Sequence, residues 1–318
     1  MEGQIMAKYC FGIDIGGTTV KCGLFTVSGE LLEKWEIKTR TEHTGIHILP
    51  DVAECILNKM KERNLTRMDV LAVGVGIPGP VEKGQNVLFA VNLHWVYTEV
   101  SYKLSTFLGG IPVKVGNDAN VAALGEMWKG GGEGNKSIIM VTLGTGVGGG
   151  IIVNGKIVAG AHGAGGEMGH ACINPDEPEQ CKCGNHGCLE QYASATGIVR
   201  IAKQVLEEAT EPTELKAESV SAKAVFDAYK KNDAVATKIV DRFAECLGYA
   251  LGILTTVIDP EAIVIGGGVS KAGDVLIEVV TKSFKKYAFS SYRDTPIVIA
   301  KLDNDAGIYG AAKLAIDD

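Results

Sequence analysis

The sequence predicts an α/β fold made of two copies of one supersecondary unit. A buried strand, a glycine-rich turn and a second strand occupy residues 9–27, and the same pattern returns at 137–155. Segments with the apolar spacing of amphipathic helices follow each copy. We therefore expect a duplicated architecture, with a small domain of residues 1–117 and a larger one of 118–302. The last helix, within 303–318, is expected to join the first domain.

In the first half, apolar runs bounded by glycine turns mark the strands, and apolar residues three and four positions apart mark the helices. Ile48, Leu49, Val52 and Ile56 have this helical spacing. The patterns predict strands at 9–17, 19–27 and 31–39, a helix at 46–63, a strand at 69–79, a helix at 98–108 and a short strand at 113–120.

The second half begins after a glycine-rich and charged break at residues 129–136. Beyond the repeated strands, residues 190–258 have mainly helical patterns, and 262–270 predict a strand with a glycine turn. The small and apolar residues of 306–316 predict the final helix.

Composition limits the partners that the protein can have. The 318 residues carry a formal net charge of −7, which argues against a nucleic acid or an anionic membrane because phosphates need a basic surface. The start of the chain lacks the features of a signal peptide, and the uncharged stretch 137–155 contains six glycines, which suit a turning loop better than a membrane span. We expect a soluble, cytoplasmic protein whose eight cysteines are reduced.

The two glycine turns are suited to holding phosphate. Glycines allow successive backbone N–H groups to point at one anion with no side chain in the way. Asp14, at the end of the first strand, has the chemistry to hold Mg²⁺ through water. An ordinary hairpin is the alternative for each turn, and the matched pair favours phosphate. The expected residues are Gly16, Gly17, Thr18 and Thr19 in the first turn, and Gly144, Thr145, Gly146 and Gly148 in the second.

Two other phosphate motifs do not fit. The loop G-x-x-x-x-G-K-[ST] is absent from the sequence, whereas G-x-G-x-x-G occurs at 74–79 and at 144–149. Neither occurrence opens a predicted helix, which the dinucleotide-binding mechanism needs for its dipole. We therefore reject a Rossmann fold.

Asp118 stands where a predicted strand gives way to a helical pattern. An Asn or Asp at such a place often caps the helix, and this is the plain interpretation. The functional interpretation is a general base, a carboxylate that takes a proton from a substrate hydroxyl. Asn117, beside it, would then orient the same substrate.

Residues 181–190, CKCGNHGCLE, contain three cysteines within eight positions. Cys181, Cys183 and Cys188 supply three thiolates, and tetrahedral zinc needs a fourth ligand. The spacing leaves His170 and His186 open as that ligand, with Cys172 as a weaker substitute. Four protein ligands would leave no position for water, so this zinc would be structural.

These segments together resemble the ROK family, which contains glucokinases, other sugar kinases and sugar-responsive repressors. The matching segments occur in the family's order and span nearly the whole chain. They are DIGGTT, VGIPGP, GNDANVAALGE, LGTGVGGGIIVNG, GGEMGH, CKCGNHGCLE and IGGGVS.

The resemblance implies a duplicated actin- and hexokinase-like fold with its active site in the cleft between domains. It makes Asp118 the base on the sugar hydroxyl and chooses His170 as the fourth zinc ligand. The sugar site would be lined by Gly79, Asn117, Asp118, Glu167, His170 and Glu190. Beside the two phosphate turns and Asp14, the nucleotide site would include Lys21, Gly267 and Gly268.

The implied activity is that of a sugar kinase, most like ATP-dependent glucokinase, that uses ATP and Mg²⁺ to phosphorylate the 6-hydroxyl of glucose. A kinase for another hexose, such as N-acetylmannosamine or fructose, and a non-catalytic sugar sensor are the alternatives. The family's repressors carry a helix-turn-helix ahead of the kinase-like part, and the position of Asp14 leaves no room for one. We expect no DNA binding, and a homodimer or homotetramer as is usual for the resemblance.

Overall fold

The computed structural model describes residues 7–317, and the chain forms two compact units. The first unit comprises the described residues of Met1–Gly134, Gly150–Gly165 and Asn304–Asp318, and the second comprises Asn135–Gly149 and Gly166–Asp303. This division differs from the expected 1–117 and 118–302, because helix α3 (Asp118–Lys129) and residues 150–165 pack with the first unit.

The first unit is built on a five-stranded sheet with the strand order β3-β2-β1-β4-β7. Its first three strands, β1 (Tyr9–Ile15), β2 (Thr19–Thr26) and β3 (Leu31–Lys38), form an antiparallel meander joined by short turns. The other two, β4 (Val70–Ile77) and β7 (Val113–Asn117), run parallel to β1. A two-stranded ribbon, β5 (Val81–Glu82) and β6 (Asn86–Val87), follows β4.

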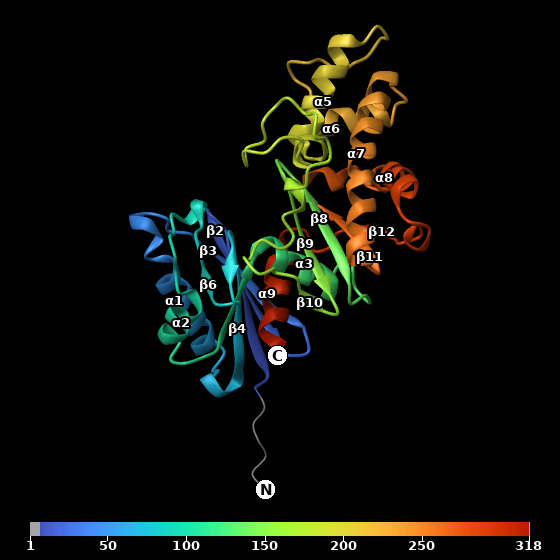
Figure 1. Ribbon diagram of the computed structural model, residues 1–318. Helices are drawn as coiled ribbons and strands as arrows, with labels where there is room; N and C mark the ends of the chain where they lie inside the picture. Colours follow the sequence, from blue (N-terminus) through green and yellow to red (C-terminus); the bar gives the residue numbers. More distant parts are fainter. Residues whose placement is uncertain (1–6, 318) are drawn as a thin grey trace. The chain divides into compact units, whose positions relative to one another are not determined.

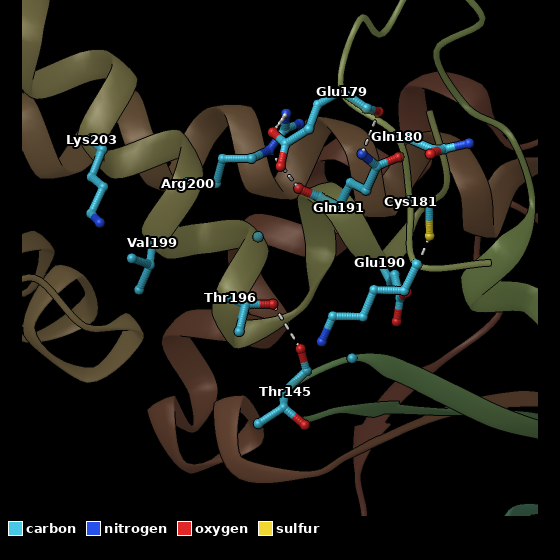
Figure 2. Close-up of a pocket in the computed structure, with 13 residues that line it drawn as sticks. Thr145, Glu179, Gln180, Cys181, Glu190, Gln191, Thr196, Val199, Arg200 and Lys203 are labelled. Carbon is cyan, nitrogen blue, oxygen red and sulfur yellow. Dashed lines mark hydrogen bonds and ion pairs between the residues drawn. The ribbon is translucent and has the colours of Figure 1, made fainter. Parts of the chain in front are cut away.

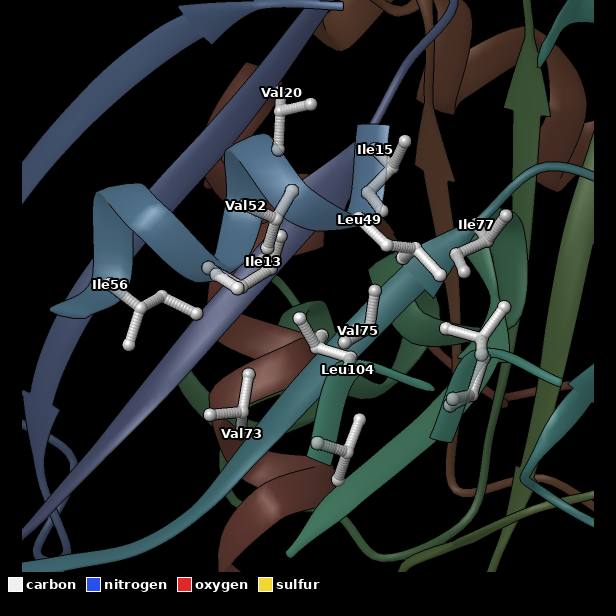
Figure 3. Close-up of a cluster of buried hydrophobic side chains, with 14 of the residues drawn as sticks. Ile13, Ile15, Val20, Leu49, Val52, Ile56, Val73, Val75, Ile77 and Leu104 are labelled. Atoms are coloured by element: carbon white, nitrogen blue, oxygen red, sulfur yellow. The ribbon is translucent and has the colours of Figure 1, made fainter. Parts of the chain in front are cut away.

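Alternation along the strands divides the first unit's core between the two faces of this sheet. On one face, Phe11, Ile13 and Ile15 pack with residues of α1 (Ile48–Glu62) and α2 (Val100–Phe107), as Figure 3 shows for the neighbours of Ile13. On the other face, Cys10 packs with residues of helix α9 (Ala306–Ile316). The sheet is therefore covered on both sides (Figure 1).

Helix α9 approaches its neighbours so closely that backbone meets backbone. A Cβ atom added at Gly74 of β4 would lie 1.8 Å from the carbonyl oxygen of Ala311, and one added at Gly310 would lie 1.7 Å from that of Val121 in α3. Real Cβ atoms do not approach an oxygen so closely, so these positions require glycine. The C-terminal helix thereby ties α3 to the sheet of the first unit.

The second unit is centred on a sheet with the strand order β10-β9-β8-β11-β12. Strand β9 (Val147–Val153) continues into the first unit, where its end pairs with β10 (Lys156–Ile157). The strands β8 (Ile138–Leu143), β11 (Ala262–Gly266) and β12 (Ile297–Ile299) are parallel to one another. The helices of this unit are α4 (Glu190–Ala193), α5 (Ala195–Glu208), α6 (Ala222–Tyr229), α7 (Ala234–Ile258) and α8 (Asp274–Tyr287), with α7 alongside α8 (Figure 1).

Most predicted elements are present, and the helix predicted at 46–63 is α1 within two residues. The strand predicted at 113–120 is wrong at its end, because Asn117 caps α3 and the chain is helical from Asp118. Strand β10, which follows β9 after a tight turn, has only two residues. Among the helices of residues 7–317, none combines the length and apolarity that crossing a bilayer requires.

Candidate functional site

The turn between β1 and β2 is closed by its own backbone and anchored by Thr39. Gly16 N donates to Thr19 O at 3.0 Å, which closes the turn. Thr39 donates through its backbone N–H to Thr18 O at 2.9 Å and through its hydroxyl to Gly16 O at 2.7 Å. Gly17 and Thr18 remain exposed at the tip, so the first predicted phosphate turn is open to a ligand.

Asp14 lies beside this turn as a largely desolvated carboxylate. Burial raises its pKa from 3.8 to about 6; the charge of Lys21 lowers this pKa and that of Asp118 raises it. Lys21 pairs with Asp14 across the β1–β2 ladder, and its Nζ donates to Asn304 O at 2.9 Å. A poorly hydrated carboxylate with a second one in its field is chemically suited to a hard divalent cation such as Mg²⁺.

Asp118, Asn117 and Gly79 are linked by hydrogen bonds at the start of α3. Asn117 is the helix cap, with its Oδ1 accepting from Asn120 N at 3.1 Å. Its Nδ2 donates to Gly79 O at 3.1 Å and to Asp118 Oδ1 at 3.0 Å. Because Asn117 fulfils the capping role, the carboxylate of Asp118 is left for another purpose.

Only one oxygen of Asp118 is engaged within the described residues. Oδ1 accepts from Ala119 N at 2.8 Å and from Asn117, whereas Oδ2 has no such partner. Burial raises the pKa of Asp118, and the hydrogen bonds from Ala119 and Asn117 oppose that rise. The result is an oriented carboxylate with one oxygen available to a substrate hydroxyl.

In the second unit, the turn between β8 and β9 lies against Glu190. Gly144 N donates to Gly146 O at 3.0 Å, and Thr196 at the start of α5 donates its hydroxyl to Thr145 O at 2.7 Å. A Cβ added at Gly146 would lie 2.5 Å from Glu190 Oε2. The predicted phosphate turn and a predicted sugar-binding carboxylate therefore meet within one unit. Gly148 lies in β9 rather than in the turn itself.

Four predicted metal ligands converge beside Glu190. The ligand atoms of His170, Cys181, Cys183 and Cys188 all lie within 4.8 Å of one another. Cys183 Sγ is 3.6 Å from Cys188 Sγ, and Cys181 Sγ is 3.9 Å from His170 Nδ1. Tetrahedral zinc with Zn–S bonds of about 2.3 Å has edges of about 3.8 Å, which these two distances match, so the donor set fits zinc.

His186 and Cys172 lie outside this cluster. The Nδ1 of His186 is 3.0 Å from the carbonyl oxygen of Glu177, to which it donates. Cys172 is exposed, and it pairs with Cys188 only through the backbone, in an isolated β-bridge. Of the two histidines that the spacing left open, the structure brings His170 to the thiols.

Glu190 is the side chain that joins the cluster to the turn. Its Oε1 accepts from Cys181 Sγ at 3.3 Å and lies 3.9 Å from His170 Nδ1. Glu167 is exposed and precedes the short turn that carries His170, whose backbone N–H donates to Glu167 O at 3.1 Å. The Glu190 carboxylate and the His170 imidazole lie together, and such a pair suits a ligand with several hydroxyl groups.

Two cavities of the second unit adjoin these residues. One, of 630 Å³, is lined by Thr145, Gly146, Cys181 and Glu190 among others (Figure 2). The other, of 380 Å³, includes Gly268 in a mainly apolar lining. Gly267 precedes it with φ 83°, and an added Cβ there would lie 2.6 Å from Leu143 O.

Sequence analysis missed several residues that support these turns. Thr39 and Thr196 each act through one hydroxyl, and Asn92 lies with its Cβ and carbonyl oxygen 3.4 Å from a Cβ built at Gly17. Gly307 is needed because an added Cβ would lie 2.5 Å from the Asp14 carboxylate. The sequence carries no spacing signal for these threonines, because each lies far along the chain from the turn that it contacts.

Comparisons with known proteins agree with this organisation. The model of the ROK family matches residues 10–318. A glucokinase of Halalkalibacterium halodurans is 42% identical over 313 residues, covering 96% of this chain and 94% of that protein.

Solved structures give the same result. The structure of a ROK family glucokinase from Streptomyces griseus, in complex with glucose and AMPPNP, has a TM-score of 0.71 and 34% identity, and the match covers 96% of this chain and 98% of that one. A ROK hexokinase from Thermus thermophilus has a TM-score of 0.80 and 30% identity, with 96% and 97% covered. The predicted duplicated α/β fold class of the actin and hexokinase type is confirmed. The chain belongs to the ROK family, as its ordered motifs predict.

Proposed function

We propose that this protein is an ATP-dependent hexose kinase that transfers the γ-phosphate of ATP to the 6-hydroxyl of glucose. The observation that carries the proposal is the state of Asp118: desolvated, oriented through Oδ1 and open at Oδ2. The glucokinase of H. halodurans and the glucose complex of the S. griseus enzyme support glucose as the sugar.

Asp118 is proposed as the general base. Its free Oδ2 would accept the proton of the sugar hydroxyl as the oxygen attacks the γ-phosphorus, while Asn117 keeps the carboxylate in place. A raised pKa makes this carboxylate a stronger proton acceptor than an exposed aspartate. Gly79 is linked to the same unit through Asn117 and would lie against the sugar.

The second unit is proposed to bind the remaining sugar hydroxyls through Glu167, His170 and Glu190. The four-ligand cluster would hold a structural Zn²⁺, which supplies cross-linking of the loop and no open coordination position. Glu190 would keep its Oε2 beside Gly146, whereas the hydrogen bond from the Cys181 thiol to Oε1 belongs to the metal-free protein, because a zinc-bound thiolate has no proton to donate.

The two glycine turns are proposed to bind the phosphates of ATP, with the nucleoside in the 380 Å³ cavity at Gly268. Backbone N–H groups of the turns would stabilise the charge that spreads over the transferring phosphoryl group. Asp14 would hold Mg²⁺, which would neutralise phosphate charge, and Lys21 adds a further positive charge nearby. A cytoplasmic location and a homodimer or homotetramer remain proposals from the family resemblance.

Replacing Asp118 by Asn should lower sugar-dependent ADP release by about 10²- to 10⁴-fold while the fold is kept, because Asn cannot take the proton. The assay supplies Mg-ATP with glucose, fructose, allose, N-acetylmannosamine or N-acetylglucosamine. Asp69→Asn is the control with normal turnover, because Asp69 is a partly exposed carboxylate in a 3-10 turn of the same unit.

Three results separate the alternatives. Near-normal turnover of Asp118→Asn would refute the base assignment. Preference for an acetylated sugar would keep the mechanism and replace glucose as the substrate. Sugar binding by the wild-type protein without ADP release would refute the kinase and identify a sensor.

The metal site is tested by zinc content after dialysis against a competing chelator. We expect one zinc per chain in the wild-type protein and loss of zinc in Cys183→Ser and Cys188→Ser, because each removes one of four ligands. His186→Asn should retain zinc, since His186 donates to a backbone carbonyl instead. Loss of zinc in His186→Asn with retention in His170→Asn would contradict the assignment.

Asp14→Asn should make the metal-free protein more stable near neutral pH, although it removes a group needed for activity. Folding raises the pKa of Asp14 above its unfolded value, so the folded protein binds this proton more tightly and loses stability as the pH rises from about 4 to 6. Urea unfolding should show a gain of about 2–3 kcal/mol at pH 7.5 that shrinks toward pH 4.

The control variant Asp69→Asn should change the stability in the opposite direction. Hydrogen bonds from Thr66 hold the pKa of Asp69 below its usual value, so Asp69→Asn should lose stability near pH 7, and this loss should fade as the pH falls through that pKa. An Asp14→Asn variant that is less stable than the wild type at pH 7.5 would show that ionised Asp14 stabilises the first unit.

A further inference from the structure

We propose that Arg200 is a positioning residue that holds Glu190 and the cysteine loop in their working arrangement. The inference rests on the proposed function and deepens it. It names a residue that positions the proposed sugar-binding carboxylate of Glu190 and the metal ligands through neighbouring residues. Arg200 lies on α5, and its side chain is 18% exposed.

The guanidinium of Arg200 makes hydrogen bonds in three directions. Its Nη1 and Nη2 donate to the two carboxylate oxygens of Glu177 at 3.0 and 2.8 Å, a bidentate pair. Nη1 also donates to Glu179 Oε2 at 3.1 Å, and Nε donates to Gln191 O at 3.2 Å. The Tyr192 ring lies 4.9 Å from Cζ. Arg200 thus contacts residues on both sides of the cysteine loop, 181–188.

Gln191 carries this contact to the metal ligands and to Glu190. It follows Glu190 directly in α4, so fixing its carbonyl oxygen fixes the backbone that bears the Glu190 carboxylate. Its side-chain Oε1 accepts from Cys188 N at 3.0 Å, and its Nε2 donates to Glu179 O at 2.9 Å. One residue, Gln191, therefore separates Arg200 from both Glu190 and the metal ligand Cys188.

Glu177 anchors the other end of the loop. Its side chain is 7% exposed, and its carboxylate also accepts a hydrogen bond from the Tyr192 hydroxyl. Its carbonyl oxygen accepts from His186, which lies inside the cysteine loop. The hydrogen bonds from Arg200 hold the pKa of Glu177 at about 2, so the pair is charged throughout the working pH range.

Geometry requires arginine in this place. A planar fork can bind both oxygens of Glu177 and still present Nε to Gln191, whereas a lysine has one ammonium group for all these acceptors. Figure 2 shows the Arg200 side chain directed toward Glu179 and Gln191, while Lys203, one turn further along α5, lies apart from both.

Two variants test the proposal. Arg200→Lys should raise the KM for the sugar at least tenfold, leave the KM for ATP within about twofold and speed zinc release to a chelator by about 10-fold or more, the usual effect of losing an outer partner of a metal ligand. Arg293→Lys is the control, because Arg293 makes one hydrogen bond to a backbone oxygen of the same unit.

The double variant Arg200→Gln with Glu177→Gln guards against simple misfolding. It removes both buried charges, so it should unfold at higher urea concentration than Arg200→Gln alone, yet keep the raised sugar KM and the fast zinc release. A folded double variant with the wild-type KM for the sugar and the wild-type rate of zinc release would overturn the proposal. Because zinc release needs no turnover, it still tests Arg200 if the wild-type protein proves not to be a kinase.

Discussion

The backbone contact between α9 and the rest of the first unit is the constraint on which the positions of Asp14 and Asp118 depend. Added Cβ atoms would lie 2.1 Å from Ile308 O at Gly12 and 2.2 Å from Ala306 O at Gly125, so glycines on β1 and on α3 both receive the helix. Because α3 begins at Asp118, helix α9 also fixes the proposed base. Gly307 of the same helix contacts Asp14 and helps to desolvate it.

In the second unit, polar contacts fix the positions of the candidate site residues. In the metal-free protein Glu190 lies between Cys181 and Gly146, and the loop around it is hydrogen-bonded to α5 through Arg200. Groups that are fixed before the substrate arrives need no reorganisation during the reaction, which is the main source of electrostatic catalysis. The two units thus hold the proposed base and the proposed sugar-binding carboxylate by different physical means.

Local pattern predicted most of the elements and the chemistry-bearing residues. The spacing of Ile48, Val52 and Ile56 was sufficient for α1, and the matched glycine motifs identified the two turns that are proposed to bind phosphate. Grouping of α3 with the first unit could not be read from the sequence, because it depends on glycines of α3 and α9 that meet across almost 200 positions.

The choice between the two histidines shows the same limit. His186 lies among the cysteines in the sequence and His170 eleven residues before Cys181, and spacing left both open as the fourth ligand. In the structure the Nδ1 of His186 donates to the carbonyl oxygen of Glu177, and His170 is the histidine that lies with the thiols. That oxygen is a backbone atom, which no residue pattern identifies. The roles of Thr39 and Arg200 were equally hidden, since each acts through tertiary hydrogen bonds.

The most direct test of the account is phosphorus NMR of the protein with glucose and Mg-ATP. The account predicts that the γ-phosphate signal of ATP falls as the signal of a hexose 6-phosphate grows by the same amount, with both reactants required. Release of the γ-phosphate as inorganic phosphate, or no change in its signal at any glucose concentration, would contradict it.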